Sequence, residues 1–214
     1  MSPPEQLPIM ALLEQPLAHD PKYCLAKQST LHLKKRMMSL SSASRLDLGR
    51  ARRVADMPQG DYTLLDDSGE TLFKCTGKIN MKQEKTITNP NGDVVVTLLT
   101  KAMSMVQETV AKTPAEQEVF RIRLDTKTMK HRVSGDLVDS ITGRPIHATI
   151  TVQNGWKCHS MVEIDGECVG YVYRDKWTNM DHKIELAANM DYVFVASLVI
   201  LLDIITLETL HTVI

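Results

Sequence analysis

The C-terminal part of the chain contains a segment that is apolar on almost every side. Residues 190–207, MDYVFVASLVILLDIITL, hold no charged residue between Asp191 and Asp203. A length of about 18 residues is normal for a helix and too long for one strand. The uncharged stretch is also shorter than the ~20 residues that cross a bilayer. A helix without a polar face must be surrounded by protein or lipid, so this segment constrains the rest of the fold.

We expect this helix within residues 189–207. Asn189 is the predicted N-cap, and Asp191 is then in the first turn, where the helix dipole favours an anion. The residues predicted to make its buried surface are Val193, Val195, Leu198, Ile200 and Leu201.

The middle of the chain has the pattern of β-hairpins. Three turn sequences, Asp67-Ser68-Gly69, Pro90-Asn91-Gly92 and Asp165-Gly166, separate short runs of strand-forming residues. Asn-Gly and Asp-Gly supply the positive φ angles that tight hairpin turns need. Apolar and polar residues also alternate along other segments, which indicates strands with one wet face. The predicted strands are 31–34, 61–66, 71–76, 85–89, 94–99, 120–124, 146–152, 161–164 and 168–173.

A weak internal repeat supports the hairpin interpretation. Gly69 and Gly92 are 23 residues apart, as are Lys78 and Lys101, and GKINMKQEKTI matches TKAMSMVQETV in that register. So many hairpins predict an antiparallel sheet large enough to curl or close. The curled sheet is the expected surround for the apolar helix.

Prolines mark the first part of the chain as irregular. Residues 1–22 contain five prolines, and we expect an irregular lead-in there, followed by a single domain over residues 23–210. A chain of 214 residues is long enough to bury a full core without disulfides. The start of the sequence has no secretory signal pattern, which predicts a reducing, cytoplasmic location and free thiols.

The charge of the chain argues against nucleic acid as a partner and leaves a local binding surface open. The net charge of −1 provides no bulk attraction for nucleic acid. Basic residues nevertheless concentrate in residues 27–53, opposed there by one acid, Asp47. A charge run of this kind is either a solvated loop or a binding surface.

Motifs for catalysis or metal binding are missing from the sequence. It has no GxGxxG, GxxxxGK[ST], HExxH or GxSxG pattern and no zinc-ligand spacing, so we predict no enzyme, no cofactor and no metal site. The run Asp66-Asp67-Ser68-Gly69-Glu70 has some likeness to a calcium loop. A hairpin turn is the favoured interpretation, because the alternating ligands of such a loop are absent.

An ordered set of segments carries a family resemblance. In chain order these are HDPKYC and LHLKKRMMSLSS, DYTLLDDSGETLFKCTGK, NPNGDVVVTLL, GYVYRDKW and DYVFVASLVILLDII, over about residues 19–207. The chain resembles the LURP-one-related family, a branch of the tubby C-terminal-like superfamily that also includes phospholipid scramblases. The resemblance implies a closed antiparallel barrel of about twelve strands, threaded by a central C-terminal helix. One departure is an inserted basic loop at residues 44–59.

The resemblance implies binding and no chemistry, because superfamily relatives bind phosphoinositides through basic side chains on the barrel. The corresponding hypothesis is a non-enzymatic module, peripheral at a membrane, that recognises anionic phospholipid headgroups or a protein partner. Its candidate lipid-binding residues are Lys34, Lys35, Arg36, Arg50, Arg52 and Arg53. The alternative is a scramblase-like protein that uses the C-terminal helix as a membrane anchor. We expect no span across the membrane.

Overall fold

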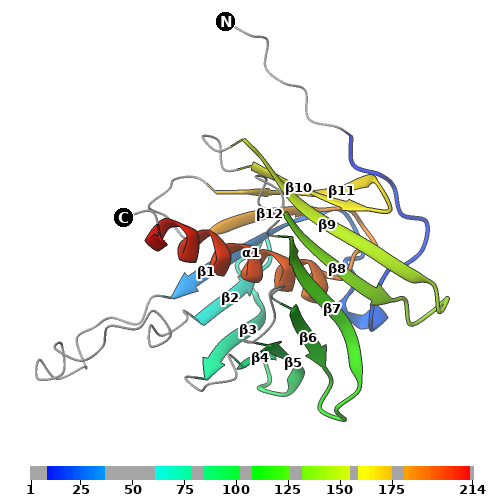
Figure 1. The fold of residues 1–214 in the computed structure, drawn as a ribbon. Helices are drawn as coiled ribbons and strands as arrows, with labels where there is room; N and C mark the ends of the chain where they lie inside the picture. The colour runs from blue at the N-terminus through cyan, green and yellow to red at the C-terminus, as the bar shows by residue number, and fades with distance from the viewer. Residues whose placement is uncertain are drawn as a thin grey trace, which may run out of the picture.

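Twelve antiparallel strands close into a barrel in simple sequence order (Figure 1). The structure, a computed structural model, describes residues 9–36, 61–78, 84–101, 108–125, 132–154, 159–174 and 181–212. Each strand pairs with its neighbours in sequence, and β1 closes the barrel against β12, with Leu31 opposite Ile184. The strands are β1 (Ser29–Arg36), β2 (Asp61–Leu65), β3 (Thr71–Lys78), β4 (Glu84–Thr88), β5 (Val94–Lys101), β6 (Glu108–Lys112), β7 (Glu118–Asp125), β8 (Arg132–Val138), β9 (Pro145–Asn154), β10 (His159–Ile164), β11 (Glu167–Tyr173) and β12 (His182–Leu186).

The one α-helix among the described residues, α1 (Tyr192–Thr212), runs through the barrel (Figure 1). Four of its five predicted core residues, Val193, Val195, Leu198 and Ile200, are completely buried, and Leu201 is partly buried against the same core. The predicted fold class, a closed barrel around a central apolar helix, is confirmed. The apolar side chains from Val193 to Leu202 are therefore covered mainly by the barrel and not by lipid.

Both ends of the helix differ from the prediction, since α1 begins at Tyr192 and extends past residue 207 to Thr212. Asp191 is the N-cap, since its Oδ1 accepts hydrogen bonds from the backbone N–H groups of Val193 at 2.9 Å and Phe194 at 3.0 Å. Asn189 is not the cap. It has a φ of 65°, and its side-chain amide donates to the Leu13 carbonyl at 2.7 Å. The aspartate therefore precedes the first turn and satisfies two of its backbone donors.

The hairpin turns follow from their glycines. At the β10–β11 turn both Asp165 and Gly166 have positive φ, as a two-residue hairpin of right-handed twist requires. In the β2–β3 turn Gly69 alone has positive φ, and the Asp66 carboxylate accepts hydrogen bonds from Ser68 and Glu70. The acidic run at residues 66–70 is thus a hairpin turn stabilised by its own first carboxylate.

The lead-in covers the end of the barrel where α1 begins. Residues 9–25, the described part of the lead-in and the first residues after it, contain one short 3₁₀ helix, Pro21–Tyr23. Leu17 forms a β-bridge to Met190, and Cys24 forms one to Asp191. His19 contacts the Asp191 carboxylate through its ring Nδ1 and its backbone N–H. Residues 17–24 are therefore packed on this end of the barrel, where they contact polar groups around the helix N-terminus.

Gly135 on β8 allows α1 to approach the barrel wall. A Cβ at this position would lie 2.8 Å from Leu198 Cδ2 and 2.9 Å from Phe194 Cε2. Such distances are shorter than real carbon contacts, so the helix fits against β8 only because glycine has no side chain.

We expect Gly135→Ala to lower the free energy of unfolding by about 1–3 kcal/mol, the usual cost of overpacking a core. Urea denaturation followed by circular dichroism measures this change. The control is Ser134→Ala, the outward neighbour on the same strand, which should stay within about 0.5 kcal/mol of the unaltered protein. Unchanged or increased stability of Gly135→Ala would contradict the close packing of α1 on β8.

Candidate functional site

Strand alternation separates the three basic residues at the end of β1. Side chains of successive strand residues point to opposite faces. Leu31 and Leu33 are fully buried, so Lys35 follows them into the barrel, whereas Lys34 and Arg36 are exposed on its outside. Lys35 does not lie on the outer face with Lys34 and Arg36, since its side chain is only 6% exposed and pairs with Asp203 of α1. Its part in lipid binding stays a prediction.

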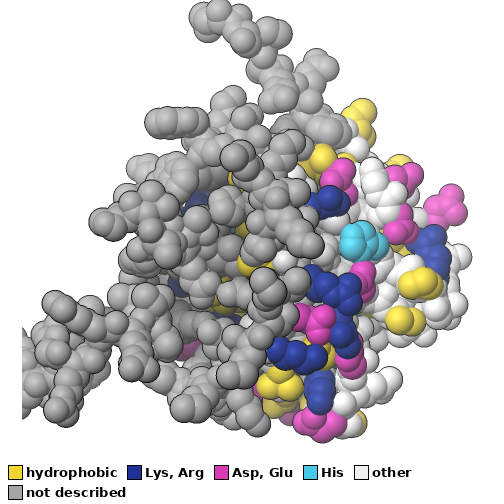
Figure 2. All heavy atoms as spheres, viewed as in Figure 1, with side chains coloured by type: hydrophobic (Ala, Val, Ile, Leu, Met, Phe, Trp, Pro, Cys, Tyr) yellow, Lys and Arg dark blue, Asp and Glu magenta, His cyan; other side chains and the backbone are white. Residues whose placement is uncertain are grey.

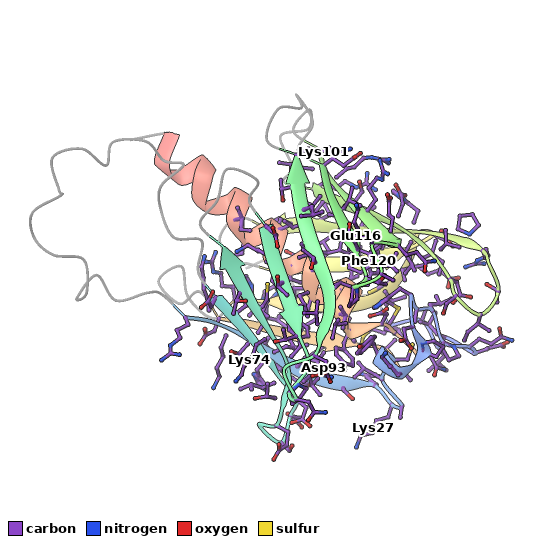
Figure 3. All side chains as sticks on the ribbon, turned by 90° about the horizontal axis from the view of Figure 1, so that it is seen from below. Lys27, Lys74, Asp93, Lys101, Glu116 and Phe120 are labelled. Atoms are coloured by element: carbon purple, nitrogen blue, oxygen red, sulfur yellow. The ribbon has the colours of Figure 1, made fainter. Side chains whose placement is uncertain are left out.

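The outside of β1–β3 carries a short row of basic side chains. In the register of the sheet Lys34 lies opposite Thr63, and Thr63 lies opposite Lys74. Lys74 is exposed on β3 (Figure 3). We call Lys34, Arg36 and Lys74 the basic row. Arg36 lies opposite Asp61, while Lys34 and Lys74 have no ion-pair partner in the part of the chain that the structure describes.

The connection between β1 and β2, which contains the predicted basic loop, begins and ends beside this row. Arg36 ends β1, Asp61 begins β2, and the two residues are paired across the strands. The two strand ends that residues 37–60 connect therefore lie side by side at one end of the barrel. The candidate residues Arg50, Arg52 and Arg53, and the whole predicted loop 44–59, lie outside the described residues. They remain predictions.

The outer surface of β6–β9 differs from that of β1–β3, because its basic side chains form ion pairs with acidic ones. Arg121 donates to Glu118 and Glu108, and Arg123 donates to Glu108 and to Asp136 at 2.7 Å. Figure 2 shows basic and acidic side chains intermixed over the face that is turned to the viewer. This surface has little net charge to offer an anionic partner.

Inside the barrel, several polar side chains converge on Asp203, a fully buried residue of α1. Its Oδ2 accepts hydrogen bonds from Lys35 Nζ at 2.8 Å and from the Tyr62 hydroxyl at 2.9 Å. Its Oδ1 lies 3.1 Å from Arg174 Nη2 and 3.4 Å from His182 Nε2. We call these five residues the polar layer. They come from α1 and from the β1, β2, β11 and β12 side of the barrel.

The polar layer lies beyond the last apolar layer of the lumen. Along β1 the inward residues run Leu31, Leu33 and then Lys35, and along α1 Leu202 precedes Asp203. This is the end of the barrel where α1 leaves (Figure 1). In Figure 3 it is the Lys101 end of β5, opposite the turn at Asp93.

Electrostatics favour the charged form of Asp203. Burial alone would raise its pKa, but the hydrogen bond from His182 and the charge and hydrogen bond of Lys35 hold the pKa well below the ordinary aspartate value. Burial, together with the Asp203 charge, raises the pKa of Tyr62, so its hydroxyl stays protonated and donates. The layer is a charged hydrogen-bonded network enclosed by the barrel.

Sequence reasoning missed the polar layer, although a signal for it was present. Lys35 continues the inward positions of Leu31 and Leu33, and His182 alternates with the buried Ile184. Asp203 was treated only as the end of the uncharged stretch. A charged residue within an enclosed helix requires buried partners, so its presence was the indication.

Comparison with models of protein families shows to which family the chain belongs. The model of the LURP-one-related family matches residues 51–203. The chain belongs to the LURP-one-related family. Its barrel begins before the matched region, because β1 at Ser29–Arg36 completes the closure.

A crystal structure of an Arabidopsis thaliana protein has a similar fold. The two share 17% sequence identity with a TM-score of 0.54, and the likeness covers 87% of this chain and 96% of that one. A search of curated proteins gave no match. Among the described residues of this LURP-one-related protein, no helix is long and apolar enough to cross a membrane.

We expect Asp203→Asn to lower the free energy of unfolding at pH 7 by about 3–5 kcal/mol. The change leaves Lys35 and Arg174 buried without their counter-charge, and breaking one side of a buried ion pair has this cost. Denaturant unfolding measures the loss. Asp136→Asn on the outer surface is the control, and its loss should stay under about 1 kcal/mol because Asp136 is 44% exposed.

The pH dependence provides a second readout of the same substitution. Because the folded-state pKa of Asp203 is lowered, its stabilisation is fully present above the ordinary value of 3.8 and is lost as the pH falls below it. The unaltered protein should therefore lose more stability than Asp203→Asn below about pH 4. Equal acid sensitivity of the two proteins would contradict a charged Asp203.

Proposed function

We propose that this protein is a non-catalytic binding module that attaches to anionic phospholipid surfaces through the outside of β1–β3. The observation that carries the proposal is the basic row, in which the exposed Lys34 and Lys74 are uncompensated within the described residues. The charge pairing on β6–β9 supports the choice of this face over the other.

The spacing of the row suits phosphate-bearing headgroups. Adjacent strands are ~4.8 Å apart, so Lys34 and Lys74, on either side of Thr63, have backbones about 10 Å apart. Each basic residue near an anionic bilayer contributes ~1 kcal/mol. Two or three such residues give only weak binding. The arginines of residues 44–59 would strengthen it, because the strand ends that flank this segment lie beside the basic row.

A non-catalytic role is consistent with the interior of the barrel. Fully buried side chains of α1 such as Phe194 and Leu198 fill its middle. A substrate-sized apolar molecule would have to displace this core. The scramblase-like alternative is not favoured either, because the helix it uses as an anchor has its apolar residues inside the barrel.

The test is sedimentation of the protein with vesicles of phosphatidylcholine, with and without anionic phosphatidylserine or phosphoinositide, at several salt concentrations. We expect preference for the anionic vesicles and a steep loss with salt, since exposed charges act over only ~8 Å at physiological ionic strength. Lys34→Glu with Lys74→Glu should abolish the preference without unfolding the protein. Arg50→Glu with Arg52→Glu and Arg53→Glu should weaken it as well.

A matched double variant keeps the test specific to this face. Lys101→Glu with Lys112→Glu makes the same change in net charge on β5 and β6, where both lysines are exposed or half-buried and ion-paired. This control variant should retain most of the preference for anionic over phosphatidylcholine vesicles. Equal loss in both double variants would mean that only total charge matters. No preference in the unaltered protein would end the lipid proposal and favour a protein partner.

A further inference from the structure

His32 on β1 lies on the outside of the barrel, beside the basic row. It alternates with the fully buried Leu31 and Leu33, so its side chain points outward, and 42% of that side chain is exposed. Lys34 is the next outward residue on the same strand. His32 is therefore an imidazole at the edge of the face proposed to bind anionic phospholipid.

Both strands that flank β1, β12 and β2, place groups near this imidazole (Figure 1). On β12, Lys183 is paired with His32 across the strands, and its Nζ donates to Glu185 at 2.6 Å. On β2, Leu65 is paired with His32. The β2–β3 turn adds Asp67, whose Oδ1 is 4.0 Å from the His32 Nε2.

The fixed charges nearest the imidazole balance one another. Lys34 and the β12 lysine are basic, and the β12 glutamate and the turn aspartate are acidic. Two further carboxylates lie farther along β1. Asp181 accepts a hydrogen bond from the Lys35 backbone N–H at 3.1 Å, and Asp61 is paired across the strands with Arg36. With the fixed charges balanced, the protonation of the imidazole itself changes the local charge by a full unit.

We infer that His32 is a pH-dependent contact of the membrane-binding face, and that its protonation strengthens attachment to anionic phospholipid. This inference rests on the proposed function, because it adds a regulated residue to the same face. Histidine is the side chain that ordinarily changes charge between about pH 5 and 8, and it becomes positive as the pH falls. Both ring nitrogens of the protonated form are donors, and a charged donor binds a phosphate oxygen strongly.

The other described histidines occupy different surroundings. His19 and His182 are buried against carboxylates. His147 lies on β9 and contacts Asp136 at 2.7 Å, on the surface where the charges are paired. His159 lies on β10, three strands from β1, which is about 14 Å across the sheet. Substitution of single histidines can therefore assign a pH effect to His32.

The experiment measures sedimentation of the full chain with phosphatidylcholine vesicles, with and without phosphatidylglycerol. The measurements are made at about pH 7.5 and about pH 5.5, at constant ionic strength. Phosphatidylglycerol keeps its single negative charge at both pH values, so a change in binding comes from the protein. We expect the affinity of the unaltered protein for the anionic vesicles to rise about fivefold at the lower pH, the effect of one added charge near the membrane surface.

Two variants of the histidine test its role in opposite directions. His32→Gln keeps a polar side chain that cannot be protonated, so it should bind like the unaltered protein at the higher pH and lose most of the rise. His32→Lys carries a fixed positive charge, so at the higher pH it should bind about as tightly as the unaltered protein does at the lower pH. Thermal unfolding followed by circular dichroism checks that both variants stay folded, as expected for an outward, partly exposed position.

His147→Gln is the matched control, because its side chain is 53% exposed and lies outside the proposed face. It should keep the full rise in affinity. His159→Gln should keep most of the rise, since its distance from His32 exceeds the ~8 Å over which exposed charges act at physiological ionic strength.

The outcomes separate this inference from the membrane proposal. A preference for anionic vesicles at both pH values, without a rise at the lower pH, would overturn the role of His32 and leave the membrane proposal standing. A rise of the same size in His32→Gln would also overturn it. No preference at either pH would end the membrane proposal and this inference together. A rise that His32→Gln removes and His147→Gln retains is the result expected.

Discussion

A helix with no polar face is stable in water only when other elements cover all of its sides, and α1 imposes this requirement on the whole chain. An open sheet would cover one side and leave two strand edges exposed. Closure of β1 against β12 covers every side and removes both edges. Gly135 allows the wall to come close enough for side chains of the helix, such as Phe194 and Leu198, to pack against it without a void.

The enclosure also explains the polar layer. Asp203 is a fully buried charged residue of α1, so its carboxylate needs partners that the barrel wall supplies. Lys35 and Lys34 are adjacent in sequence and have different roles for this reason. Lys35 faces the lumen and pairs with Asp203 of α1, and Lys34 faces outward, where its charge is available for a partner.

The fold was largely predictable, because its signals are local and periodic. The glycines at 69, 92 and 166 mark hairpins, and the alternation along β1 and β9 marks strands with one buried face. The site was predicted less well. The basic run Lys34–Lys35–Arg36 was treated as one charged surface, although strand alternation divides it. The convergence of Lys35 and His182 on Asp203 was missed, because that contact depends on how far the helix extends through a closed barrel.

Amide hydrogen exchange tests the central claim, that α1 is enclosed by the barrel, most directly. An enclosed helix exchanges only when the barrel opens, so amides from Val195 to Leu202 should exchange with the free energy of global unfolding measured by denaturant. Strand amides on either side of β8 should show the same value. Helix amides that exchange by a much less costly opening, while the strands stay protected, would contradict the account.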